Sequence, residues 1–134
     1  MPGYSGTPLP KKLGIKDSFH VCLVDAPSEV ISELKLTLDK CTRVNDTKSG
    51  IDFAMVFTKS GTALTKEFKR LTKLLSPAGM LWVSWPKKTS GVPTDLNENV
   101  VREIGLAAGL VDVKVCAVTE VWSGLKFVRR LKDR

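Results

Sequence analysis

Lysine and hydroxyl side chains gather directly after the most apolar segment of the chain, at Lys87, Lys88 and Ser90. Ammonium and hydroxyl groups bind phosphate or carboxylate groups, so this composition is typical of an anion site. A helix is expected to begin nearby, at about Thr94, and free N–H groups at a helix start favour an anion further. The sequence therefore predicts a ligand-binding loop, with a solvated, solubilising loop as the alternative.

Three further polar residues follow other predicted strands: Asp25, Thr58 and Lys59. In open parallel α/β sheets, ligands bind at the carboxyl ends of the strands, near the point where the strand order reverses. We therefore expect these three residues to share one site with the lysines of the first loop. The chain has no phosphate-binding Gly-x-x-x-x-Gly-Lys loop, nucleophile elbow or metal-ligand cluster, so no catalytic residue and no metal site is predicted.

A second basic group has helical spacing and consists of Lys66, Lys69, Arg70 and Lys73. It lies opposite an apolar stripe formed by Leu64, Phe68, Leu71 and Leu75. Such a face could hold the phosphates of a nucleic acid, although no aromatic side chain is interleaved with it for base stacking. A solvated helix face is the alternative interpretation.

The single histidine and the three cysteines carry no visible reactive arrangement. His20 has no fixed Asp or Ser companion in the sequence, so we expect a structural role for it. Cys22, Cys41 and Cys116 cannot all pair, and their spacing fits neither a zinc knuckle nor a redox pair. We interpret them as small apolar residues and predict no cofactor.

The elements that would position these residues alternate between strand and helix. Apolar runs predict strands over 19–24, 42–44, 51–57 and 80–85, with helices beginning near 28, 62 and 94. Residues 111–121 and 125–131 are β-like and joined around Ser123-Gly124, which predicts an antiparallel hairpin. The expected fold is α/β, with a mostly parallel sheet, helices on both faces and a C-terminal hairpin.

Turn and cap signals set the expected ends of two helices. Pro77 and Gly79 are predicted to end the second long helix and to lead into the strand over 80–85. Thr94 is predicted to cap the last helix, whose buried face would comprise Leu96, Val100, Ile104 and Ala107. Trp82 and Trp85 are three residues apart on a strand, so they should face opposite sides of the sheet.

Length and composition indicate one domain. The 134 residues are interpreted as an N-terminal arm over 1–12 and a single α/β domain over 13–134. No apolar run is long enough for a bilayer and no secretory signal pattern begins the chain, so we expect a cytoplasmic protein without a membrane partner. The net charge of +7 favours anionic partners such as nucleic acid, nucleotides or phosphorylated metabolites.

Residues 74–87, with their Ser76-Pro77-Ala78-Gly79 turn before an apolar strand, resemble the fifth strand of class I S-adenosylmethionine-dependent methyltransferases. The resemblance implies a Rossmann-like sheet and, after the first strand, a glycine-rich loop for the cofactor. Those positions here read Asp25-Ala26-Pro27-Ser28, and proline has no N–H to offer. The acidic residue that would hold the ribose is not identifiable either. We therefore expect neither cofactor binding nor methyl transfer.

Four motifs resemble a family of small bacterial proteins classified as a domain of unknown function: YSGTPL at 4–9, WPKKTSGVPTDL at 85–96, VCAV at 115–118 and WSGL at 122–125. The resemblance implies a bacterial source and a stand-alone domain, and it carries no activity. The predicted function is a non-catalytic methyltransferase-like module that binds a partner or a small anionic ligand through the loop after 80–85 and the N-terminal arm. Two alternatives stay open: an enzyme acting on an anionic substrate around Lys87, Lys88 and Asp25, and nucleic-acid binding through the basic helix face.

Overall fold

The computed structural model describes residues 7–45 and 47–134, whose strands form one six-stranded sheet in the order β2-β1-β3-β4-β6-β5. The first four strands are parallel to one another: β1 (His20–Val24), β2 (Thr42–Arg43), β3 (Ile51–Phe57) and β4 (Leu75–Pro86). The last two, β5 (Leu110–Ala117) and β6 (Trp122–Arg129), form an antiparallel hairpin, and β6 is antiparallel to β4. The predicted fold class is confirmed.

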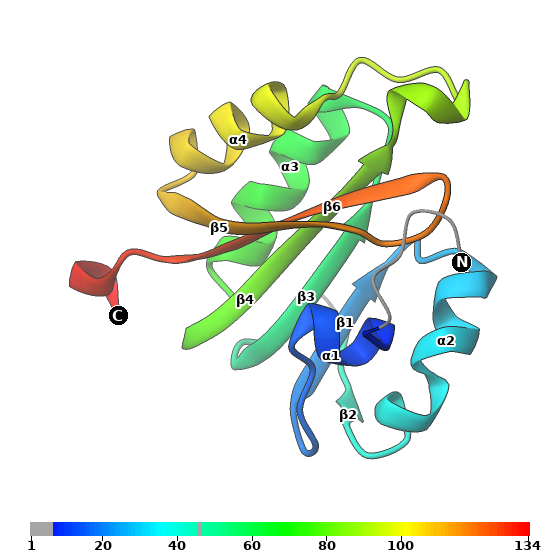
Figure 1. Ribbon diagram of the computed structural model, residues 1–134. Helices are drawn as coiled ribbons and strands as arrows, with labels where there is room; N and C mark the ends of the chain where they lie inside the picture. The colour runs from blue at the N-terminus through cyan, green and yellow to red at the C-terminus, as the bar shows by residue number, and fades with distance from the viewer. Residues whose placement is uncertain (1–6, 46) are drawn as a thin grey trace.

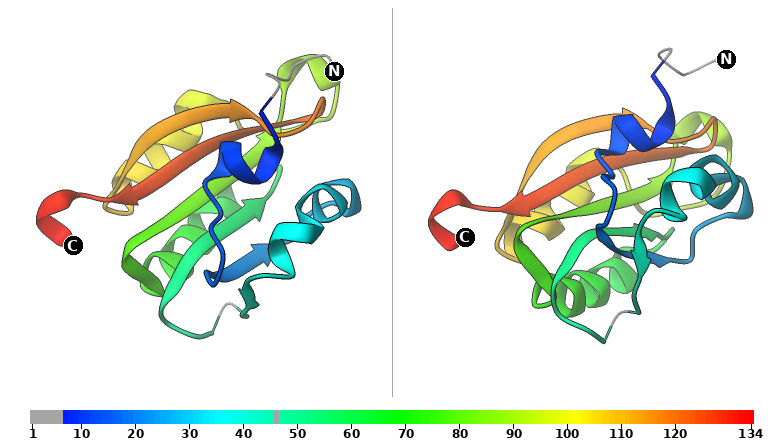
Figure 2. Two further views of the ribbon diagram at one scale, coloured as in Figure 1. Left: turned by 60° about the horizontal axis from the view of Figure 1, so that its bottom comes forward. Right: turned by 90° about the horizontal axis from the view of Figure 1, so that it is seen from below.

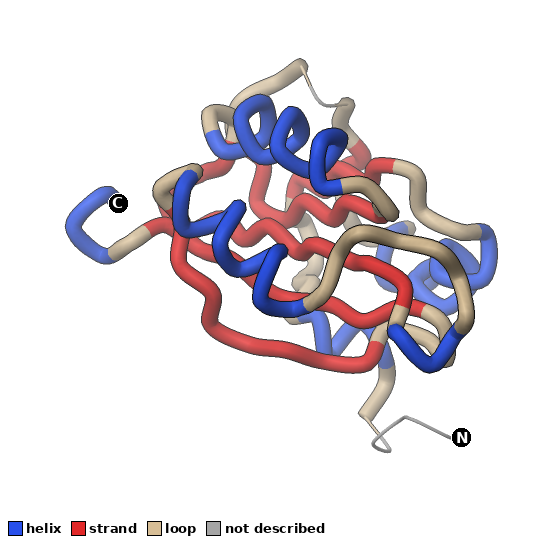
Figure 3. The backbone as a smooth tube through the Cα atoms, turned by 90° about the horizontal axis from the view of Figure 1, so that it is seen from above, coloured by secondary structure: helices blue, strands red, loops and turns tan. Residues whose placement is uncertain are grey.

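Helices cover both faces of the sheet (Figure 1, Figure 3). Helices α1 (Leu9–Leu13) and α2 (Ser28–Leu38) lie on one face, while α3 (Gly61–Thr72) and α4 (Glu98–Ala107) lie side by side on the other. Trp82 is buried on the face covered by α1 and α2, and Trp85 is buried on the face covered by α3 and α4, as their three-residue spacing predicts. No helix in the described part of the chain is long and apolar enough to cross a bilayer.

Helix α1 spans the end of the predicted arm and the first residue of the predicted domain, and it is anchored to the sheet. Leu9 and Leu13 are buried against α2, and Trp82 Nε1 donates a hydrogen bond of 2.9 Å to the carbonyl oxygen of Leu13. A buried indole N–H needs such a partner, so this bond fixes the position of α1. Residues 1–6 of the arm lie outside the described residues.

The beginning of β4 differs from the prediction. Helix α3 ends at Thr72 and β4 begins at Leu75, so Pro77 and Gly79 lie within the strand rather than at a helix end. The pairing of β3 with β4 shifts register here, and a Cβ atom on Gly79 would lie 2.6 Å from the carbonyl oxygen of Ile51. Gly79 therefore permits a close approach of two strand backbones.

Helix α4 begins later than predicted. Asn97 caps it, because its side-chain oxygen accepts a hydrogen bond of 2.9 Å from the N–H of Val100. Thr94 is not the cap, and its hydroxyl donates instead to the carbonyl oxygen of Lys59 at 2.7 Å. The later start rotates the buried face, so that Val101 and Gly105 are buried in the helix. Of the four residues predicted for that face, Leu96 is buried before the helix, Val100 and Ile104 are half-buried, and Ala107 is exposed.

The hairpin turn lies at residues 118–121 instead of at Ser123-Gly124. Val118 N–H donates to the carbonyl oxygen of Trp122 at 2.9 Å, which closes the turn. Ser123 and Gly124 pair with β4 inside β6. A Cβ atom on Gly124 would lie 2.9 Å from Val118 and 3.2 Å from Trp82, so this glycine serves close packing and does not form a turn.

Candidate functional site

The predicted ligand residues follow three adjacent parallel strands and therefore leave the same edge of the sheet (Figure 1). Asp25 follows β1, whereas Thr58 and Lys59 follow β3. Lys87, Lys88 and Ser90 follow β4 and lie at the 3₁₀ turn η1 (Lys88–Ser90). This edge is where open α/β sheets bind ligands.

Hydrogen bonds hold the loop after β4 in place. Lys87 N–H donates to the carbonyl oxygen of Val121 in the hairpin turn at 2.7 Å. Ser90 Oγ donates to the carbonyl oxygen of Lys87 at 2.6 Å and accepts from Val92 N–H at 3.2 Å. The hydroxyl of Ser90 thus supports the loop and is not left over for a ligand, whereas Lys87 is half-buried and Lys88 is exposed.

The loop after β3 joins the same cluster. The carbonyl oxygen of Lys59 accepts hydrogen bonds from the Thr94 hydroxyl at 2.7 Å and from Asp95 N–H at 3.4 Å, so the end of the β4 loop returns to Lys59. Thr58 Oγ1 accepts from Ser60 N–H at 3.3 Å, which shapes the turn into α3. We call Lys59, Lys87 and Lys88 the edge lysines.

No edge lysine forms an ion pair with another residue in the described ranges. Asp25 is separate from them, because it borders a hollow of about 290 Å³ at the ends of β1 and β2 together with Cys22, Leu23, Val24, Val44 and Asn45. No hydrogen bond or ion pair within the described chain joins Asp25 to an edge lysine. The enzyme alternative, which places Asp25 beside Lys87 and Lys88, gains no support from this geometry.

The loop after β1 has an unusual backbone. Asp25 has a φ of 56°, the left-handed conformation that glycine adopts without cost and that Asp tolerates better than most residues. Pro27 precedes α2 as its N-cap without a side-chain cap, and Glu29 occupies the first turn. The helix start therefore carries its own negative charges and lacks one backbone donor.

The basic residues of α3 lie on the solvent side of that helix, opposite the buried residues Leu64, Phe68 and Leu71. The lysines at 66, 69 and 73 are exposed, while Arg70 forms an ion pair with Glu67. Together they border a shallow hollow of about 580 Å³ beside Thr47 and Leu74. Leu75, expected on the apolar face of the helix, belongs to β4.

His20 does have acidic and hydroxyl companions, which sequence reasoning missed. Asp52 Oδ2 accepts from His20 N–H at 2.8 Å and lies 3.3 Å from His20 Nδ1, while Asp52 Oδ1 accepts from the Ser76 hydroxyl at 3.2 Å. The carboxylate is central, whereas a catalytic triad needs the histidine between the other two groups. The trio lies at the amino ends of β1 and β3 and the start of β4, away from the ligand edge, and joins the three strands.

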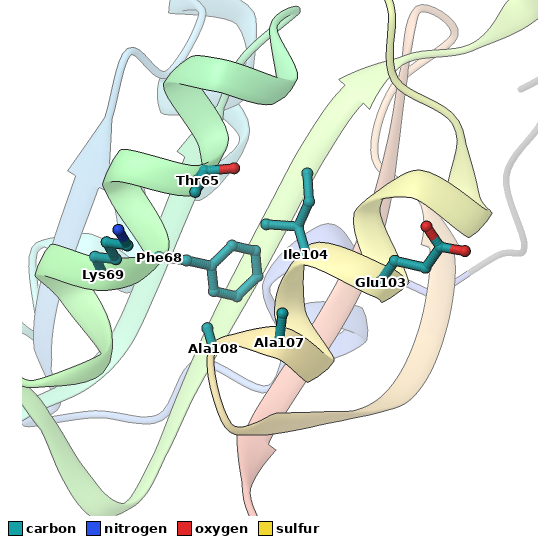
Figure 4. A pocket seen from close by; sticks show the side chains of 7 residues that line it. All are labelled: Thr65, Phe68, Lys69, Glu103, Ile104, Ala107 and Ala108. Carbon is teal, nitrogen blue, oxygen red and sulfur yellow. The ribbon is translucent and has the colours of Figure 1, made fainter.

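An apolar groove between α3 and α4 is a second feature that the sequence did not single out (Figure 4). Its volume is about 310 Å³. Figure 4 shows the Phe68 ring pointing from α3 toward α4, where small side chains at the end of the helix leave room for it. Thr65, Lys69, Glu103, Ile104, Ala107 and Ala108 complete the lining.

Other ionisable groups have structural roles. The pKa of Asp112 is lowered, because Arg102 donates to its carboxylate at 2.9 Å and so joins α4 to β5 on the surface. Burial raises the pKa of the Cys41 thiol. Burial also raises the pKa of the Cys116 thiol, and this effect outweighs the opposite effect of two nearby lysines. Within residues 7–45 and 47–134, no three His, Cys, Asp or Glu side chains gather closely enough to bind a metal ion.

Several solved structures with a similar fold are methyltransferases. The chain is similar to precorrin-6y C5,15-methyltransferase from Geobacter metallireducens GS-15, with a TM-score of 0.62 and 12% identity over 91% of this chain and 86% of that one. Magnesium protoporphyrin IX methyltransferase from Synechocystis PCC 6803, solved with bound SAH, matches with a TM-score of 0.58 and 12% identity. The match covers 90% of this chain and 78% of that one. The fibrillarin pre-rRNA processing protein of Methanococcus jannaschii matches with a TM-score of 0.56 and 8% identity. The match covers 93% of this chain and 70% of that one.

These likenesses show a methyltransferase-like fold and nothing about activity, because the identities are only 8–12%. No protein-family model and no curated protein matches the chain significantly. The resemblance to a small bacterial family therefore continues to rest on its sequence motifs.

Proposed function

We propose that the protein is a non-catalytic module of methyltransferase-like fold that binds a small anionic ligand between the loops after β3 and β4. The observation that carries the proposal is the set of edge lysines. They follow adjacent strands on loops held by hydrogen bonds, and they form no ion pair within the described part of the chain. Three ammonium groups on loops at one edge of the sheet favour a ligand with several negative charges.

The loop after β1 argues against the cofactor of the structural relatives. Glu29 already places a carboxylate in the first turn of α2, where the helix dipole would otherwise favour the carboxylate of S-adenosylmethionine. Pro27 also removes a backbone donor from this loop. Calorimetric titration of the protein with S-adenosylmethionine is therefore expected to show no binding at micromolar concentration, and a micromolar dissociation constant would contradict the non-catalytic assignment.

The anion site is tested by reversing the charge of the loop after β4. We expect phosphate or a nucleotide to raise the melting temperature of the wild type, and Lys87→Glu combined with Lys88→Glu to abolish this increase while the fold persists. The control is Lys66→Glu with Lys69→Glu, which changes the net charge equally on the exposed face of α3. Equal ligand-induced shifts in the wild type and the loop variant would refute the site.

Nucleic-acid binding through α3 is the second candidate, because Lys66 and Lys69 of the helix and Lys73 just after it are exposed and border one hollow with Arg70. The same control variant tests it. A nucleic-acid site predicts that binding of a single-stranded oligonucleotide weakens steeply with salt and is lost in the α3 variant. Binding that is unaffected by that variant would exclude the α3 face. The cytoplasmic location and the bacterial source remain predictions from the sequence.

A further inference from the structure

A different basic hollow lies between α1 and the edge strand β5, on residues that sequence reasoning did not connect. Its volume is about 540 Å³, and it is lined by Thr7, Lys11, Lys12, Lys114, Val115, Cys116 and Ala117. Both views of Figure 2 show α1 beside the carboxyl end of β5. No carboxylate belongs to this lining among the described residues. The chain thus brings together lysines that are about a hundred residues apart.

Two reciprocal hydrogen bonds fix the walls of the hollow. Lys12 Nζ donates to the carbonyl oxygen of Ala117, and Lys114 Nζ donates to the carbonyl oxygen of Lys12, each at 2.8 Å. An ammonium group has three donors, so Lys114 can keep this bond and still bind a ligand. The charges of Lys12 and Lys114 are therefore held in place before any ligand arrives, which lowers the entropic cost of binding.

The lysines also repel one another. Lys114 of β5 lies directly opposite Lys126 of β6 in the hairpin register, an arrangement that destabilises a strand pair. The pKa of Lys126 is lowered, first by burial and then by the charge of Lys114. Lys12 and Lys114 in turn lower the pKa of the Cys116 thiol against the larger effect of burial. A bound anion beside Lys114 would relieve its repulsion with Lys126.

We propose that the hollow between α1 and β5 is a second ligand site, which takes a small molecule carrying two or more linked phosphate groups. Its phosphates would lie against Lys11 and Lys114, and any apolar part would lie on Val115 and Ala117. The hollow falls within the usual range of small-ligand sites, roughly 300–1,000 Å³. No aromatic side chain lines it for base stacking, in the part of the chain that the structure describes, which favours a small molecule over a nucleic acid.

The proposal has a structural competitor, because lysines on an edge strand also prevent edge-to-edge aggregation. That role needs exposed charge on β5 and nothing from α1. A ligand site needs both walls. The decisive variants therefore include Lys11, which lies on α1 and is exposed.

Inorganic tripolyphosphate is the probe, and ¹H–¹⁵N NMR titration is the measurement. Amide shifts of Cys116 report the hollow, and amide shifts of Ser90 report the site proposed above, so each dissociation constant is measured separately. We expect the double variant Lys11→Gln with Lys114→Gln to raise the dissociation constant measured at Cys116 by at least about tenfold, because two charged contacts are lost. The matched control, Lys87→Gln with Lys88→Gln, removes the same charge and should leave that constant within about twofold.

Several outcomes would overturn the inference. The first is a wild type without a saturable shift at Cys116, and the second is an equal rise of the dissociation constant at Cys116 in both double variants. Either result would show only a general attraction of tripolyphosphate to a basic protein. Oligonucleotide binding without tripolyphosphate binding would indicate a nucleic-acid surface instead. The single variant Lys11→Gln leaves both lysine–carbonyl bonds in place, so a normal fold with unchanged affinity would also refute the site. Saturable binding at Cys116 without saturable binding at Ser90 would refute the proposed function and leave this inference standing.

Discussion

The substitution Gly105→Ala tests how α4 packs on the sheet. Gly105 is buried, and a Cβ atom there would lie 2.1 Å from Cε1 and 2.5 Å from Cζ of Phe127. An ordinary carbon–carbon contact needs ~3.5–4.0 Å, so the ring or the helix would have to retreat by about 1.5 Å. Retreat of the ring is hindered because Phe127 already meets Phe68 edge to face, with ring centroids 5.0 Å apart.

Two opposing effects set the magnitude. Overpacking of a dense core costs about 1–3 kcal/mol, and this contact is severe enough for the upper end of that range. Alanine in place of glycine inside a helix stabilises by about 1 kcal/mol. We therefore expect a net loss of about 2 kcal/mol in the free energy of unfolding, and a melting temperature lower by roughly 6–8 °C.

Urea unfolding followed by circular dichroism measures the loss, and Phe127→Leu supplies the control. Leucine lacks the ring atoms nearest the new methyl group, so Gly105→Ala should cost less in the Phe127→Leu background than in the wild type. A Gly105→Ala protein as stable as the wild type, or more stable, would refute the reasoning, because helix propensity alone would then decide the result.

Three further predictions concern the strands and the surface. Leu81→Ala, in a strand residue that is 1% exposed, should lower the free energy of unfolding by about 2–5 kcal/mol in urea, and an unchanged midpoint would contradict the central place of β4. Asp25→Gly should raise the melting temperature slightly, because it removes a left-handed non-glycine residue; a lower value would show that the Asp25 side chain has a structural role. Asp112→Asn should destabilise at neutral pH, since Arg102 lowers the pKa of Asp112 and the ionised carboxylate is favoured in the folded state. The contribution of the ionised carboxylate to stability is present above the ordinary Asp pKa of about 3.9 and is lost as the pH falls below it. The free energies of unfolding of the wild type and Asp112→Asn should therefore become equal in acid. A difference that does not change with pH would exclude the ion pair as its cause.

Sequence alone determined the elements whose pattern is local. The apolar run over 51–57 coincides with β3, and the alternation of strands with amphipathic helices predicts a parallel sheet covered on both faces. The rule for parallel strands also predicts that Asp25, Thr58, Lys59, Lys87, Lys88 and Ser90 lie at one edge of the sheet, and they follow strands that end there. Such features follow from residue periodicity and chain direction, which are properties of short segments.

Only the tertiary structure decided what depends on contacts between distant segments. The sequence predicts that Gly79 ends a helix and that Gly124 forms a turn, and it singles out no role for Gly105. In the structure, a Cβ atom at each of the three would lie closer than 3.0 Å to an atom of another segment. Asp25 follows a strand that is close to those of the edge lysines, but it borders a hollow that none of the edge lysines lines. The reciprocal bonds between Lys12 on α1 and the end of β5 join residues more than a hundred positions apart. No local pattern encodes such a pairing, because it exists only once the sheet has brought both ends of the chain together.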